Sequence, residues 1–191
     1  MSLCDFSDGI LHEYQFAYLF LGCQNIVTAP ILPATTLSQC CYYNMFNGCT
    51  HLTQAPVLPA TELENKCYLQ MFVNCTLLQN IPNLPAPELK KCCYRGMFRN
   101  CLSLRAVELP RAKFSSEGGS YANMFNGCKN LNSVTVHFVD WDRREQNMCT
   151  TYWLKDVSPT GTFTKMECLC NQIDESHIPE GWTIVNKPIE P

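Results

Sequence analysis

Several features of common protein classes are missing from this sequence. None of its 191 residues lies in an apolar run approaching the roughly 18 residues that a transmembrane helix needs. The formal net charge is only -3, and a protein that neutralises nucleic-acid phosphates needs a basic surface. The first residues, from Met1 to Asp5, have neither the basic nor the apolar segment of a signal peptide. We therefore expect no membrane span, no nucleic-acid partner and no signal peptide in this chain.

The motifs of the common enzyme classes are also missing. The sequence has no Gly-x-Ser-x-Gly, and none of its histidines, His12, His51, His137 and His177, lies in a nucleophile motif. Neither of the glycine-rich phosphate-binding motifs occurs. We expect a protein without catalytic residues and without a cofactor.

A metal site has one weak candidate. Cys168 and Cys170, together with Cys149 and His177, offer four side chains of the right type. Structural zinc sites usually place ligand pairs two to four residues apart, and no second pair exists here. We predict no metal, and a disulfide among the three cysteines stays open as an alternative.

Repetition is what the sequence has in abundance. A Met-Phe or Leu-Phe pair occurs five times, each time followed three residues after its Phe by a cysteine. The spacing is 26 residues, and 27 in the last step. A fixed period of this length predicts a solenoid, in which each unit buries its core against the next. The pairs are Leu19-Phe20, Met45-Phe46, Met71-Phe72, Met97-Phe98 and Met124-Phe125.

The unit from Cys49 to Asn74 predicts a short strand followed by a helix. Leu52 to Val57 alternates loosely between apolar and polar residues, and Pro56 limits the length of the strand. Thr61 and Glu64 have the spacing of a helix capping box. The apolar residues after it follow a helical stripe. They are Leu63, Cys67, Tyr68, Met71 and Phe72.

The predicted packing implies a curved solenoid. Strands stack about 4.8 Å apart, whereas helices pack about 8–10 Å apart. A coil with strands on one side and helices on the other must curve, with its strands on the concave face. We place five repeats of about 26 residues in 1–139 and a C-terminal cap in 140–191. In the cap, Trp153-Leu154 imitates a sixth Met-Phe pair, and strands are expected at 161–164 and 181–185.

Fourteen cysteines favour a disulfide scaffold at first sight, but their positions argue otherwise. Eight of them occupy two fixed slots of the repeat, as small buried apolar side chains would. We therefore predict free buried thiols at these positions. Cys40 and Cys92 share a third slot, which holds Lys66 in the unit between them. This slot should face solvent and carry the most reactive thiols. The eight are Cys23, Cys49, Cys75, Cys101 and Cys128, then Cys41, Cys67 and Cys93.

The repeat resembles the BspA-type leucine-rich repeats of surface proteins from host-associated bacteria and some protozoa. The resemblance rests on the order Cys-x-x-Leu, short strand, Leu-Pro, then an expected helix ending in Met-Phe-x-x-Cys, over residues 11–139. Residues 156–163 and 178–183 are similar to the closing segment of such proteins. The resemblance implies an α/β repeat fold, a right-handed leucine-rich-repeat solenoid with strands on the concave face, helices on the convex face and a β-containing cap. It also implies a cell-surface or secreted location.

Two surfaces are candidates for binding. One is a column of polar residues that should point outward from the concave face: Thr28, Gln54, Asn80 and Ser133. The other is a basic patch around the fourth unit, although charges of this kind also cover surfaces that bind nothing. The patch consists of Lys90, Lys91, Arg95, Arg99 and Arg105.

We therefore expect a non-enzymatic, adhesin-like binding module that recognises proteins or glycans of a host or a neighbouring cell. A second hypothesis is a purely structural spacer or stalk in a larger surface protein. A thiol- or metal-dependent protein is a remote third.

Overall fold

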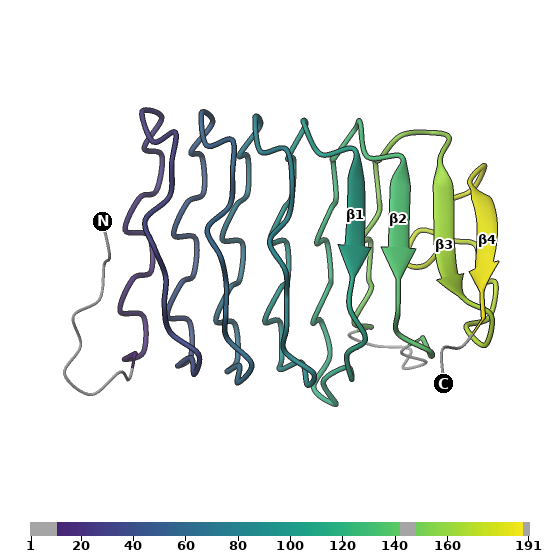
Figure 1. Cartoon of the computed structure of the whole chain (residues 1–191), viewed down its shortest axis with the longest axis horizontal. Coiled ribbons are helices and arrows are strands. Elements are labelled where there is room, and N and C mark those ends of the chain that lie inside the picture. The colour runs from purple at the N-terminus through teal and green to yellow at the C-terminus, as the bar shows by residue number, and fades with distance from the viewer. Residues whose placement is uncertain (1–10, 142–147, 189–191) are drawn as a thin grey trace.

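The computed structural model describes residues 11–141 and 148–188, and we refer to one turn of its solenoid as a rung. The rungs lie side by side along one axis (Figure 1). One side of the stack ends in a four-stranded parallel sheet of order β1-β2-β3-β4. The strands are β1 (Ala106–Leu109), β2 (Ser133–Val136), β3 (Thr162–Met166) and β4 (Thr183–Lys187). The last two confirm the strands predicted in the cap, each displaced by one or two residues.

The earlier rungs continue this side of the stack without forming full strands. Thr28 and Gln54 form an isolated parallel bridge. Two residues after them stand Pro30 and Pro56, which cannot donate a ladder hydrogen bond. Glu108 occupies the equivalent place in β1, and there the pairing runs over four residues. Proline therefore decides where bridges give way to strands.

The other side of the stack consists of consecutive β-turns, and the predicted helices are wrong. The described residues contain no helix, and the segment predicted to be one is a run of turns. Within a rung, the Met45 amide donates to the carbonyl of Tyr42 at 3.2 Å, three residues back. Between rungs, the Tyr42 amide donates to the carbonyl of Cys67 at 3.0 Å. The two kinds of bond alternate along the segment, which we call the turn ladder.

The backbone angles explain how this run of turns stays extended. Every fourth residue has a positive φ, as in Lys66 at 59°, Gln70 at 56° and Asn74 at 59°. A positive φ at the third residue is characteristic of a type II turn. Type II turns therefore alternate along the segment with turns that have no positive φ at that position. An apolar spacing of four and five residues fits such a four-residue period as well as a helix. The hydrophobic pattern alone therefore could not separate the two.

Two stacks of aromatic rings run through the core beside the turn ladder. Phe46 and Phe72 have ring centroids 5.5 Å apart and planes inclined by 2°, and Tyr68 and Tyr94 lie 5.7 Å apart at 6°. Each stacked pair adds about 1 kcal/mol beyond the burial of its area. All four rings are buried, so the stacks form a continuous core rather than separate contacts. The two stacks consist of Phe20, Phe46, Phe72, Phe98 and Phe125, and of Phe16, Tyr42, Tyr68, Tyr94 and Tyr121.

The turn ladder also removes the reason for the predicted curvature. Hydrogen bonds between neighbouring rungs fix the spacing on the turn side as they do on the strand side. No layer of helices forces one side wider than the other. The rungs in Figure 1 are accordingly drawn out in a straight stack.

The turn ladder continues beyond the five repeats into a sixth rung. The Phe125 amide donates to the carbonyl of Trp153 at 2.9 Å, as Phe98 donates to Met124 one rung earlier. Trp153 therefore occupies the Met slot, and the predicted sixth pair is confirmed. Its indole Nε1 donates to the carbonyl of His177 at 2.8 Å and so ties the last rung to the loop that covers it.

A glycine substitution distinguishes the turn ladder from a helix. Lys66 is exposed with a positive φ, a conformation that costs a residue with a side chain roughly 1–2 kcal/mol. We expect Lys66→Gly to leave the free energy of unfolding unchanged or to raise it by up to about 1 kcal/mol. Glu64→Gly, at an exposed position without a positive φ, should lower it by about 0.5–1 kcal/mol. Urea unfolding measures both, and an equal loss in the two variants would contradict the turn ladder.

Candidate functional site

The polar column lies on the outer surface of the strand side, which we call the strand face. Thr28, Gln54 and Asn80 are exposed on consecutive rungs, before the sheet becomes regular. Ser133 is half-buried in β2 and pairs with Ala106 of β1, an exposed residue. The polar column is therefore interrupted once, by Ala106.

The register of the sheet extends the column in a way that the sequence did not predict. Ser133 pairs with Thr162, and Thr162 pairs with Thr183, so two more hydroxyls join the same row. A second row beside it holds Thr135 and Thr164. The only signal in the sequence was Thr162 and Thr164 at alternate positions of the first cap strand, with a single threonine, Thr183, in the second. Without the register of the sheet, no pattern in the sequence aligns these threonines with the polar column of the repeats.

A hollow of ≈ 310 Å³ lies where the column meets the sheet. Asn80 and Ser133 of the predicted column both line it, together with Asn83, Glu108 and Thr135. These side chains supply amide, hydroxyl and carboxylate groups around a shallow depression. They can accept and donate hydrogen bonds across a polar partner that lies along the face.

Glu108 and His137 meet at the end of β1 and just beyond β2. His137 Nε2 lies 2.7 Å from Glu108 Oε1, and both side chains are partly exposed. The pair fixes the orientation of the carboxylate that borders the hollow. Neither residue was a predicted binding residue, and their sequence separation of 29 residues gave no sign of the contact.

The basic patch is divided between two sides of the stack. Lys91, Arg95 and Arg99 are spaced four residues apart on the turn ladder of the fourth rung, and all three are exposed. Lys91 lies 3.6 Å from Glu117, which offsets its charge. Lys90 is exposed beside them, whereas Arg105 directly precedes β1 on the strand side. The five charges therefore do not form one continuous surface.

The first cysteine slot forms a ladder of thiol hydrogen bonds. The Sγ–H of Cys75 donates to the carbonyl of Phe46 at 3.1 Å, and Cys101 donates to Phe72 at 3.2 Å. That carbonyl of Phe46 also accepts the amide of Cys49 at 3.0 Å. A thiol is small enough for the buried slot and still supplies a weak donor. Cysteine at this slot therefore joins neighbouring rungs as well as filling space.

Burial shifts the acid–base behaviour of these thiols. Loss of solvation raises the pKa of Cys41, Cys93 and Cys128 to about 12 and that of Cys49 to about 11. A thiol that does not ionise near neutral pH is a poor nucleophile and a poor metal ligand. Seven of the eight repeat cysteines are free and buried, as their positions in the sequence predicted. Cys23, on the first rung, is exposed, so the prediction of a buried thiol was wrong there.

The third cysteine slot differs from its prediction. Cys40 is buried, with only 1% of its surface exposed, so the expectation of a solvent-facing thiol was wrong there. Cys92 is half-buried and borders a cavity of ≈ 240 Å³ with Lys91 and Arg95. Packing against the neighbouring rung, which differs along the stack, decides the exposure of this slot.

The cysteines of the cap do not come together as a metal site. Cys168 and Cys170 are free and exposed, while Cys149 is buried with its Sγ 3.6 Å from Ser120 Oγ. Among residues 11–141 and 148–188, no group of three or more His, Cys, Asp or Glu side chains is placed to hold a metal ion. Over the same residues, no helix has the length and apolar character needed to cross a bilayer.

Comparison with known proteins gave no matching family model, no similar curated protein and no similar solved structure.

Thiol labelling tests the burial of the two slots. Iodoacetamide at pH 8 should modify Cys23, Cys168 and Cys170 in the folded protein, because these thiols are exposed. Cys67 and Cys101, which are fully buried, should react only after unfolding in urea. Peptide mapping by mass spectrometry identifies the modified residues. Labelling of Cys67 or Cys101 at the rate of Cys168 in the folded protein would show that the slots are open to solvent.

The raised thiol pKa values predict a loss of stability in alkali. Unfolded thiols ionise near pH 9, whereas Cys41, Cys93 and Cys128 stay protonated to about 12 in the folded state. The unfolded state therefore binds fewer protons, and the free energy of unfolding falls as the pH rises between these values. At pH 10.5 each such thiol should cost about 1–2 kcal/mol relative to pH 8.

Urea unfolding at the two pH values measures this loss. Cys128→Ala should show a smaller fall than the parent protein because one of the shifted thiols is gone. Cys168→Ala, which removes an exposed thiol, should show the same fall as the parent. Equal falls in the two variants would rule out the contribution of the buried thiol.

Proposed function

We propose that this protein is a non-enzymatic binding module of the leucine-rich-repeat type, located at a cell surface or secreted, that recognises proteins or glycans through its strand face. One observation carries the proposal. Polar side chains recur along the strand face from Thr28 to Thr183, with a single interruption at Ala106. Repeat proteins use such extended surfaces to bind other macromolecules.

The rigidity of the stack supports this proposal. Inter-rung hydrogen bonds hold the backbone of each rung, and the aromatic stacks hold its core. Side chains on the strand face are therefore presented from a fixed backbone, which lowers the entropy that this protein loses when it binds a partner. The hollow beside Asn80 and Ser133 gives the face a concave polar centre.

A structural spacer or stalk in a larger surface protein is the second candidate. The observation that favours it is the straight stack itself, in which each rung bonds to its neighbours through the turn ladder and the thiol ladder. Such an element keeps two attached segments at a fixed separation. In this function the polar residues of the strand face would only keep it hydrated.

An array of extracellular-matrix proteins and surface glycans distinguishes the two functions. The binding module should capture at least one component, and Gln54→Arg/Asn80→Arg should weaken that capture at least about tenfold. The control is Gln24→Arg/Asn25→Arg, which adds the same charge at exposed positions outside the polar column. No capture across the array would favour the spacer, and equal loss in both double variants would remove the strand face as the site.

A further inference from the structure

The sixth rung leaves part of its hydrogen-bonding capacity unused. In the fifth rung, the amides of Phe125 and Gly127 donate to the carbonyls of Trp153 and Lys155, at 2.9 and 2.8 Å. The equivalent amides of the sixth rung belong to Leu154 and Asp156. No acceptor for either of them lies among the described residues. Two donors that every earlier rung satisfies are thus left without a partner at the end of the turn ladder.

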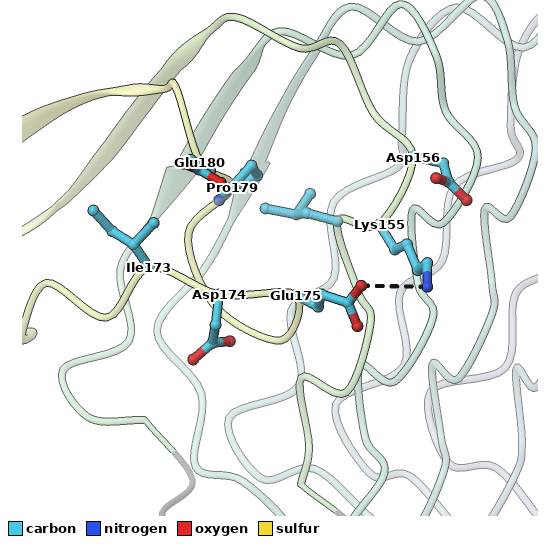
Figure 2. Close-up of a pocket in the computed structure, with 8 residues that line it drawn as sticks. Lys155, Asp156, Ile173, Asp174, Glu175, Pro179 and Glu180 are labelled. Atoms are coloured by element: carbon cyan, nitrogen blue, oxygen red, sulfur yellow. Dashed lines mark hydrogen bonds and ion pairs between the residues drawn. The ribbon is translucent and has the colours of Figure 1, made fainter.

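The covering loop stops just short of these two amides. Ser176 Oγ accepts the amide of Tyr152 at 3.4 Å, so the loop takes the place of a seventh rung at that point. Further along the same rung, Leu154, Lys155 and Asp156 instead form one wall of a pocket of ≈ 710 Å³, which we call the end pocket. Figure 2 shows Lys155 and Asp156 on one side and Ile173, Pro179 and Glu180 on the other.

The charges of the end pocket are predominantly negative. Lys155 Nζ lies 3.5 Å from Glu175, and Asp174 accepts hydrogen bonds from the His177 ring and the Ser176 amide. Partial burial alone would raise the pKa of Asp174, but these hydrogen bonds outweigh it and hold the pKa below its usual value. The carboxylates of Asp156 and Glu180 have no ion-pair partner among the described residues. They leave the pocket with unbalanced negative charge.

Together, the donors and the charges restrict what can bind. A metal cation would face backbone N–H groups, which repel it. A phosphate or carboxylate would meet Asp156 and Glu180, which repel anions. A peptide satisfies both features, because its carbonyls are neutral acceptors at a two-residue spacing and its side chains can carry positive charge. Ile173, more than half exposed, offers an apolar contact for the aliphatic part of such a side chain.

We propose that the end pocket binds a peptide segment bearing Lys or Arg, whose carbonyls accept the amides of Leu154 and Asp156 and so add part of a seventh rung. This is strand addition, applied to a ladder of turns. The site lies at the end of the stack and does not depend on the function proposed for the strand face.

Amide hydrogen exchange followed by NMR tests the backbone part of the proposal. In the free protein, the amides of Leu154 and Asp156 should exchange at least about tenfold faster than those of Phe125 and Gly127, because they lack acceptors. Saturation with the peptide Ac-Ser-Lys-Ser-Arg-Ser-Lys-Ser-NH2 should slow the first two and leave the second two unchanged. Slow exchange of Leu154 and Asp156 in the free protein, or no slowing with peptide, would overturn the proposal.

Fluorescence anisotropy with a labelled form of the same peptide tests the charge. Asp156→Asn/Glu180→Gln should weaken binding roughly three- to tenfold, and Asn tolerates the positive φ of residue 156. Glu64→Gln/Glu88→Gln, which removes the same charge at exposed positions elsewhere, should leave binding unchanged. A matched peptide with Glu at the three basic positions should not bind. Equal affinity for the acidic peptide, or equal loss in both double variants, would overturn the proposal.

Discussion

The hydrogen bonding between rungs is the constraint on which the rest of the structure depends. Every second amide of the turn ladder must meet a carbonyl of the next rung, so a rung of the wrong length would leave a whole row unpaired. The fifth unit has one extra residue. Gly118 and Gly119, both with positive φ, lie where the extra residue is accommodated. The amides of Cys92 and Tyr94 still donate to the carbonyls of Gly118 and Ser120. Two glycines that weaken a helix therefore preserve the register of the turn ladder.

The composition of the core follows from that same spacing. A stack of rungs places equivalent side chains one above another, so each slot must hold a residue that packs against its own copy. Aromatic rings do so by parallel stacking, as in Phe72 and Phe98 at 5.4 Å and 4°. Cysteine does so by donating to the rung before it, as Cys128 does to Phe98 at 3.1 Å. The high cysteine content is thus a property of the repeat and needs no disulfide or metal to explain it.

Periodicity in the sequence was enough to predict the solenoid and most of the buried slots, and local patterns predicted the strands of the cap, but neither predicted the conformation of the segments between the strands. Leu63, Cys67 and Met71 lie inside, as an apolar stripe requires, yet the stripe has the same spacing in a helix and in turns of four residues. The positive φ angles distinguish the two, and residues such as Lys66 and Gln70 give no sign of them because neither favours that conformation. The contact of Glu108 with His137 depended on the register of β1 and β2, which local patterns do not contain. The end pocket likewise depends on how residues 154–156 pack against residues 173–180, which local patterns do not contain.

The two candidate surfaces differ in what the fold requires of them. Any polar residues on the strand face would be compatible with the stack, so their pattern from Thr28 to Thr183 is not imposed by folding. The end of the turn ladder is different, because a solenoid must satisfy its last rung with something other than another repeat. Ser176 does this for Tyr152, and the loop could have continued over Leu154 and Asp156 in the same way. A pocket bordered by carboxylates lies there instead. The proposed peptide, which would complete the turn ladder, accounts both for the missing acceptors of the Leu154 and Asp156 amides and for the negative charge of the pocket.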